Sequence, residues 1–153
     1  MKFKSETDTF GQALQKLETN LETPVVPGDL SSWISNLRGS IDTVGRLLHD
    51  VVVDSHEQCF RQIQEQDPEL SPRVQQLRNE DQELLRDFEA VAGAISNLEK
   101  QNGDRVANQA DSDDKIAEIV QLGLAFVIRT RTLETTLSTW HMEAFQRDRG
   151  VGD

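Results

Sequence analysis

The side chains that could do chemistry are few and lie far apart in the sequence. The chain of 153 residues has three histidines, His49, His56 and His141, and one cysteine, Cys59. Among its many carboxylates, Asp81 is the unusual one, because it lies on a stripe of residues spaced alternately three and four apart whose other members are apolar: Val74, Leu77, Leu84, Phe88, Val91, Ile95 and Leu98. That spacing keeps side chains on one stripe of a helix. A buried carboxylate is costly unless it is paired or protonated, so Asp81 marks the first candidate site.

The histidines give no obvious metal site. Each follows a residue of a predicted core stripe by one position, which on a helix turns it about 100° away from the core. We therefore expect three surface histidines. His49 and His56 share one helix flank with several carboxylates, but a metal there would need ligands from a second helix. No Glu-x-x-His pair occurs in the sequence, which argues against a ferritin-like di-iron layout.

Other catalytic motifs are absent from the sequence. Cys59 has no adjacent histidine and lies beside Phe60 and Ile63, so we expect it to pack in the core and not to act as a nucleophile. There is no glycine-rich phosphate loop, nucleophile elbow or dinucleotide fingerprint. The residues therefore predict a protein that is not an enzyme and carries no cofactor.

Four segments show the three-and-four alternation of amphipathic helices, at residues 4–22, 30–65, 72–100 and 113–147. Proline, glycine and asparagine punctuate the breaks between them. Long helices with short connections favour an all-α fold, an antiparallel up-down-up-down four-helix bundle formed by a single domain, 1–153. Counting along such a bundle places Asp81 in neighbouring layers with five other residues, Thr7, Val51, Ser55, Leu133 and Leu137.

Helix starts have their own signals. Ser71 before Pro72 predicts a cap followed by a first turn, and Asp29 or Ser31 can cap the second helix. The acidic run 111–114 is expected to cap the last helix, where negative charge meets the positive end of the helix dipole. Arginines 129, 131, 147 and 149 give that helix a basic flank, which we expect to pair with the acidic helices.

Charge and composition limit the partners. The net charge is -11 and the isoelectric point is near 4.7, which opposes binding to nucleic acid and to anionic membranes. A single cysteine suits a reducing compartment. The first residues turn acidic before any apolar run, unlike a signal peptide, and no stretch is apolar enough to span a bilayer. We expect a cytoplasmic protein.

Several stretches resemble the second and third helices of hemerythrin-like domains, namely 60–63, 67–70 (DPEL) and 74–85 (VQQLRNEDQELL), and 143–153 (EAFQRDRGVGD) is similar to the end of some such domains. The resemblance is strongest from Leu47 to Val91 and implies a four-helix bundle around a di-iron centre. Carried over residue by residue, however, the family's ligand positions fall here on Thr7, Val51, Ser55, Asp81, Leu133 and Leu137.

Only Asp81 of these six could bind a metal, because a di-iron site needs several imidazoles and carboxylates at bonding distance. The resemblance therefore implies a degenerate member without iron. Three states of Asp81 remain open. It could reach solvent or an arginine at the bundle rim. It could be buried with a raised pKa and hydrogen-bonded to Ser55, Thr7 or Thr130. It could instead line a cavity that holds water or a small organic ligand.

The leading functional interpretation is a metal-free interaction or sensor-like module whose protein partner the sequence does not name. The alternatives are a hemerythrin-like protein that does bind iron, and a bundle that binds an apolar small molecule in its core. Trp33 and Trp140 are expected in the core, although exposed aromatics would mark an interface. Amphipathic helices also pair readily, so a homodimer is a further arrangement that the sequence allows.

Overall fold

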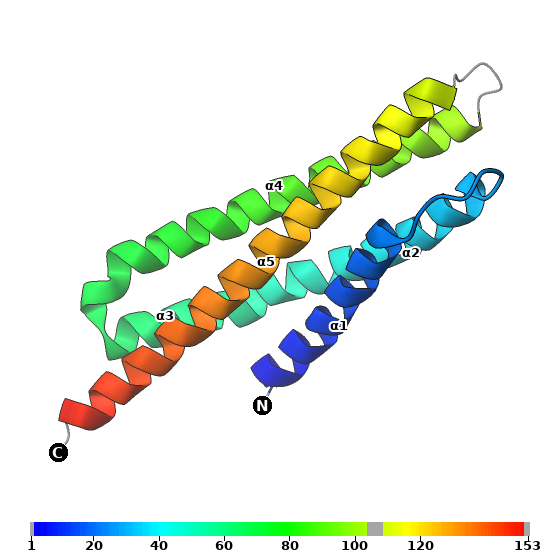
Figure 1. Cartoon of the computed structure of the whole chain (residues 1–153). Helices are drawn as coiled ribbons and strands as arrows, with labels where there is room; N and C mark the ends of the chain where they lie inside the picture. The colour runs from blue at the N-terminus through cyan, green and yellow to red at the C-terminus, as the bar shows by residue number, and fades with distance from the viewer. Residues whose placement is uncertain (1, 104–108, 152–153) are drawn as a thin grey trace.

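The computed structural model describes residues 2–103 and 109–151, and the side chains of 9–103 and 112–146 (Figure 1). All regular structure in these residues is helical, which confirms the all-α prediction. The elements are α1 (Lys2–Glu22), α2 (Leu30–Asp50), the π-helical turn η1 (Val51–His56), α3 (Glu57–Gln66), the short 3-10 turn η2 (Pro68–Leu70), α4 (Ser71–Asn102) and α5 (Gln109–Val151).

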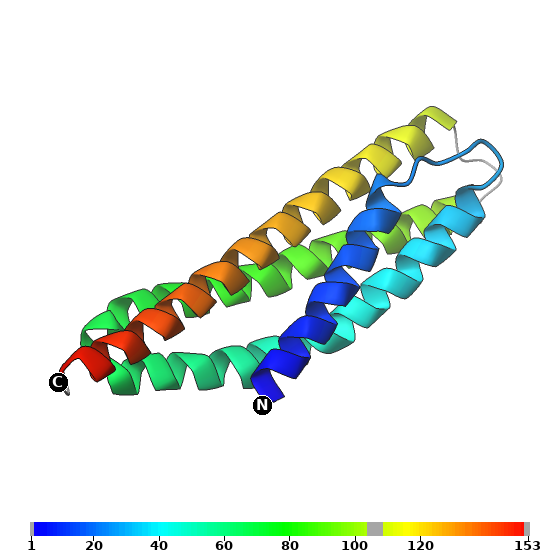
Figure 2. The same ribbon diagram turned by 60° about the horizontal axis from the view of Figure 1, so that its bottom comes forward.

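The helices lie alongside one another in an elongated molecule. Because α2, η1 and α3 follow one another without a break, they form one long rod that corresponds to the predicted helix 30–65. Figures 1 and 2 show the α1–α2 turn at the same end of the molecule as the end of α4 and the start of α5, and the α3–α4 turn at the other end. Along this length α1 packs on α2, α4 packs on α5, and α3 also contacts α5.

The apolar stripes of α1, of the α2–η1–α3 rod, of α4 and of α5 form one continuous core. On α4 every residue of the predicted stripe is buried except Phe88, which is partly buried and packs against the core. Leu37, Ile41, Leu84 and Ile95 are fully buried. Each large aliphatic side chain of this kind contributes roughly 1.5–3 kcal/mol on burial. Apolar packing therefore drives the helices together.

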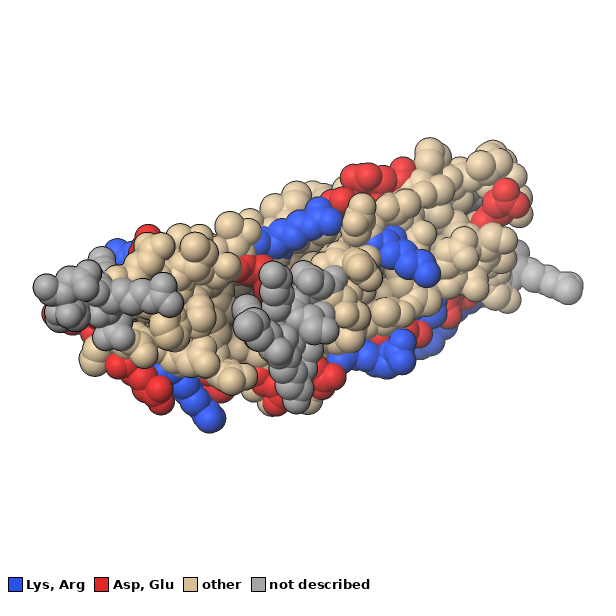
Figure 3. Space-filling view, turned by 90° about the horizontal axis from the view of Figure 1, so that it is seen from below, with Lys and Arg blue, Asp and Glu red and all other residues tan. Residues whose placement is uncertain are grey.

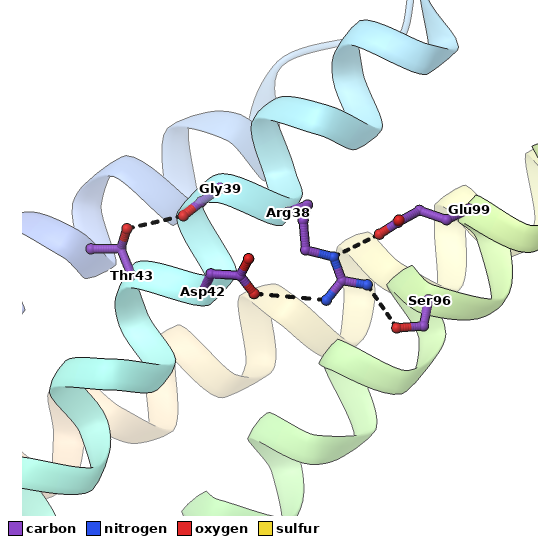
Figure 4. A network of polar contacts seen from close by, with 6 residues as sticks. All are labelled: Arg38, Gly39, Asp42, Thr43, Ser96 and Glu99. Atoms are coloured by element: carbon purple, nitrogen blue, oxygen red, sulfur yellow. Dashed lines mark hydrogen bonds and ion pairs between the residues drawn. The ribbon is translucent and has the colours of Figure 1, made fainter.

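Polar contacts then join particular pairs of helices. Arg38 of α2 donates from Nε to Glu99 of α4 at 2.6 Å and from an Nη atom to Ser96 at 2.7 Å (Figure 4). On the basic flank of α5, Arg129 pairs with Asp87 at 2.7 Å and Arg131 pairs with Glu18 of α1 at 2.7 Å. This confirms the expected pairing for these two arginines. The side chains of arginines 147 and 149 lie outside the described residues.

Some predicted helix starts differ from the structure. α4 begins at Ser71 itself, and Leu70 holds the capping position, so the prediction of Ser71 as the cap is wrong by one residue. Asp29 occupies the capping position of α2 without a side-chain cap hydrogen bond, and Ser31 instead accepts a hydrogen bond from Asn102. α5 begins at Gln109, so the acidic run 111–114 lies inside its first turns instead of ahead of them.

Trp33 lies in the core as expected, and its indole N–H donates to the carbonyl oxygen of Thr23 at 3.1 Å. Trp140 is partly buried, with the guanidinium of Arg73 over its ring at 5.2 Å.

In the described part of the chain, no helix combines the length and apolar character that crossing a bilayer requires. On the face in Figure 3, acidic and basic side chains both occur along the length of the molecule.

Close packing of α1 on α5 depends on Gly123. A Cβ added there would lie 2.6 Å from a Cδ atom of Leu21, which is itself buried. We expect Gly123→Ala to lower the free energy of unfolding by about 1–3 kcal/mol, since overpacking outweighs the gain in helix propensity. Gly39→Ala is the matched control, because nothing lies within 4 Å of its added Cβ. It should stabilise by up to about 1 kcal/mol in urea unfolding. Equal stability of the two variants would contradict this packing.

Candidate functional site: a buried His–Asp–Glu cluster

The π-helical turn η1 changes which side chains face the core. Val51, Val52, Ser55 and His56 are all buried, so two adjacent pairs point inward. A π turn closes i→i+5 hydrogen bonds and takes up one more residue than an α turn, so it widens the inward-facing arc. A strict α-helical period assigns only Val51 and Ser55 of these four to the core. Such π turns inside α-helices are frequent at functional sites.

His56 is consequently a core residue. Its side chain is 1% exposed, so the prediction that it lies on the surface is wrong. The physical reason is the π turn, which brings the position after Ser55 into the interior. His49 lies two residues before η1 begins and is exposed as predicted.

Carboxylates from two other helices bind the two ring nitrogens of His56. Nδ1 lies 2.8 Å from Oδ1 of Asp81 on α4, and Nε2 lies 2.5 Å from Oε1 of Glu134 on α5. The side chains of Asp81 and Glu134 are 3% and 15% exposed. The cluster therefore joins η1, α4 and α5 inside the molecule, and Glu134 provides its edge toward solvent.

The two carboxylate partners and the raised pKa of His56 together indicate the protonation state of the ring. When both carboxylates are ionised they can only accept hydrogen bonds, so both ring nitrogens of His56 donate, which requires the doubly protonated imidazolium. Burial lowers the pKa of His56, but the hydrogen bonds to Asp81 and Glu134 and their negative charges outweigh burial and raise that pKa to about 9. The site is therefore a buried cation between two carboxylates at neutral pH.

Asp81 is buried and paired, so the possibility that it reaches solvent or a rim arginine is wrong. The second possibility is correct in its burial. The carboxylate is bound by His56, a partner that the prediction did not include. The hydroxyl of Thr130 donates to the carbonyl oxygen of Phe126 at 2.7 Å. Burial raises the pKa of Asp81, as expected, and the hydrogen bond and charge of His56 offset only part of this effect. The side chain of Thr7 lies outside the described residues.

The ionisable side chains nearest the cluster are either paired outside it or uncharged. Glu57, which also faces Asp81, is held by Arg78 at 2.7 Å, and the same guanidinium lies over the ring of Phe60 at 5.5 Å. Cys59 is buried, and burial together with the charge of Glu134 raises its pKa to about 12. The thiol therefore stays protonated and is no nucleophile, in agreement with the expected core packing.

His141 is partly buried, hydrogen-bonded to Gln62 at 2.8 Å and close to the ring of Phe145, with centroids 4.7 Å apart. Burial lowers its pKa. It lies near the C-terminal end of α5 and takes no part in the cluster around His56. The prediction that it is an ordinary surface histidine is thus only partly right, because it has these two contacts.

The positions onto which the predicted resemblance carries metal ligands are mostly apolar and buried. Val51, Leu133 and Leu137 are at most 2% exposed, Ser55 is buried beside His56, and Asp81 is bonded to the imidazole. Aliphatic side chains offer no lone pairs to a metal. In the part of the chain that the structure describes, no group of three or more His, Cys, Asp or Glu side chains is arranged to hold a metal ion. These residues do not fit a di-iron centre.

Sequence reasoning identified Asp81 but missed its partners. The signal was present as the conflict between a carboxylate and an apolar stripe, since a buried acid needs a cation or a donor nearby. Glu134 follows Leu133 as His56 follows Ser55, one position beyond the predicted core stripe.

Comparisons with known proteins do not assign the chain to a family. A scan against models of known families, a search of curated proteins and a search of solved structures each found no match. The cluster must therefore be interpreted from its own chemistry.

The raised pKa of His56 predicts an alkaline loss of stability. Because the pKa rises from 6.5 to about 9 on folding, the stabilisation is fully present below pH 6.5 and is lost as the pH rises through 9. We expect the free energy of unfolding to fall by about 3 kcal/mol over this interval. His56→Gln should flatten the profile, whereas His49→Gln, at an exposed histidine, should not.

Asp81 acts in a separate, acidic interval. Because burial raises its folded-state pKa above 3.8, its ionised form costs stability at neutral pH, and this cost is relieved as the pH falls through the folded-state pKa.

A wild-type alkaline profile that matches that of His56→Gln would contradict the buried imidazolium.

Removing Asp81 alone should lower the free energy of unfolding more than removing Asp81 and His56 together. Asp81→Leu leaves His56 without its most buried partner, and we expect about 3–5 kcal/mol of destabilisation. Asp81→Leu combined with His56→Leu should recover most of this loss, since apolar replacement of a buried ion pair is often neutral. Chemical unfolding of the two single variants and the double variant measures the coupling. Additive losses would show that the two side chains do not interact.

Proposed function

We propose that this chain is a metal-free, non-enzymatic module of hemerythrin-like design, an antiparallel up-down-up-down four-helix bundle that acts by binding another protein. The observation that carries this proposal is that the core holds aliphatic side chains and an already paired aspartate at the positions where the resemblance places metal ligands. Val51, Leu133 and Leu137 fill ligand positions with aliphatic side chains, and Asp81 is already bound to His56. The direction in which successive rods turn back at the ends of the molecule supports the bundle (Figures 1 and 2).

The cluster supplies the link between helices that a metal would otherwise supply. A cation held between a carboxylate of α4 and a carboxylate of α5 ties these helices to the rod that contains η1. The two nitrogens of one imidazole point away from each other, so the two carboxylates cannot converge with the ring on a single ion. His56 thus suits a structural role better than ligation of a metal.

The charged groups of the interior also argue against catalysis. His56 and Asp81 are inaccessible to a substrate, and the pKa of the Cys59 thiol is raised far above neutrality. A general acid or base must come within hydrogen-bonding distance of the group that it serves. What remains available for function is the outer surface, which supports an interaction or sensor-like role. The free, buried cysteine and the acidic charge are consistent with a cytoplasmic protein.

Metal analysis tests the proposal directly. Protein purified from iron-supplemented cells should contain far less than one iron per chain and show no oxo-bridge or charge-transfer absorption. Incubation with a chelator should leave its melting temperature unchanged, because packing and the His56 cluster hold the helices. Near-stoichiometric iron with such absorption would overturn the proposal and establish the di-iron alternative. An apolar molecule retained through purification would favour the ligand-binding alternative.

A further inference from the structure

The two carboxylates that bind His56 differ in their access to solvent. The side chain of Asp81 is 3% exposed, and its Oδ1 lies 2.8 Å from Nδ1 of the ring. The side chain of Glu134 is 15% exposed, and its Oε1 lies 2.5 Å from Nε2. One partner is therefore enclosed in the core on α4, whereas the other lies at the edge of the core on α5, within reach of water.

This difference decides which hydrogen bond His56 keeps when the ring loses a proton. An imidazolium has two N–H donors, and a neutral imidazole has one. If Nδ1 lost its proton, the carboxylate of Asp81 would lose its imidazole donor in the core, where water cannot replace it. If Nε2 lost its proton, Glu134 could turn outward and be hydrated. The second loss costs less, so we expect the neutral ring to be protonated at Nδ1.

Other charged groups around His56 do not take over the role of either carboxylate. The charged side chains that precede it on α2 and η1 are exposed: His49, Asp50 and Asp54. On α3, Glu57 pairs with Arg78 of α4 at 2.7 Å. The pKa of Cys59 is about 12, so its thiol stays protonated while His56 titrates. On α1, residues 9–15 are uncharged, and the side chains before residue 9 lie outside the described residues.

We propose that the contact between His56 of η1 and Glu134 of α5 is a proton-dependent switch. While the ring is doubly protonated, the switch is closed, and His56 joins α4 to α5. When Nε2 gives its proton to hydroxide or to a buffer base, the hydrogen bond to Asp81 remains and the one to Glu134 opens. No covalent bond of the chain changes. This device goes beyond the proposed binding function and needs no partner protein.

The open state changes α5 locally and leaves the bundle packed. Leu133 and Leu137, on either side of Glu134 in the sequence, are buried, so apolar contacts still hold this part of α5. Because the pKa of His56 is about 9, the switch is closed at neutral pH and opens as the pH rises through 9. In the open state the carboxylate of Glu134 faces water, and one polar link between α5 and η1 is lost.

Nuclear magnetic resonance of the full chain, recorded while the pH is raised through 9, tests the switch. We expect Nε2 of His56 to lose its proton and Nδ1 to keep it. Methyl signals of Leu133 and Leu137 should shift over the same pH interval. Those of Ile95 and Leu98 should not, because they lie at least 14 residues beyond Asp81 on α4, about 21 Å along the helix at 1.5 Å per residue.

Glu134→Gln should disable the switch without removing the contact. The amide has a similar size, can accept a hydrogen bond from the imidazolium and can donate one to the neutral ring. We expect the titration midpoint of His56 to fall by about one pH unit or more, because a negative charge is lost beside the ring. The methyl shifts of Leu133 and Leu137 should become much smaller.

Glu143→Gln is the matched control, because it makes the same chemical change at an exposed position of the same helix. It should titrate and shift as the wild-type chain does. Circular dichroism and melting temperature establish that both variants are folded. The position of the ring proton in the wild-type chain tests the switch even if Glu134→Gln does not fold.

A neutral ring that keeps its proton on Nε2 would overturn the proposal, as would methyl shifts in Glu134→Gln equal to those of the wild-type chain. Simultaneous shifts of Ile95 and Leu98 would also overturn it, because the chain would then be unfolding as a whole.

Discussion

A single buried cation determines much of the interior of this protein. His56 lies between Asp81 and Glu134, with hydrogen bonds of 2.8 Å and 2.5 Å that join three parts of the chain. A buried ion is unfavourable unless its partners compensate for the loss of water, and here each ring nitrogen has its own carboxylate. The π turn η1 is what makes this arrangement fit, because it directs His56 inward beside Ser55. The helices are thus held together by an imidazolium as well as by apolar packing.

Much of the fold could be predicted from the spacing of apolar residues, because that spacing reports directly on which face of each helix is buried. The stripe around Asp81 on α4 is correct almost residue by residue, and the four predicted helices match the structure within a few residues at most ends. Individual caps were harder to predict, because several nearby polar residues can satisfy the same backbone groups. At the start of α4, Ser71 lies inside the helix, and Leu70 occupies the capping position without a side-chain hydrogen bond.

The site could be predicted only in part. Asp81 stood out because it breaks an apolar pattern, but an α-helical period places His56 on the surface, and only the π turn moves it inward. Nothing in the spacing of Glu134 marks it as a partner, since its approach to His56 depends on how α5 packs against α3 and η1. The resemblance to hemerythrin-like domains directed attention to Val51, Ser55, Leu133 and Leu137, which lie next to the true cluster or one turn from it.

We propose a function of the surface because the charged side chains of the core, His56 and Asp81, already bind each other. The measurement that tests this most directly is nuclear magnetic resonance of the ring nitrogens of His56 as the pH is raised. At pH 7 both nitrogens should carry a proton, and the ring should titrate near 9, well above the ordinary value of 6.5. A singly protonated ring at pH 7, or titration near 6.5, would contradict the buried imidazolium and with it this account of the core.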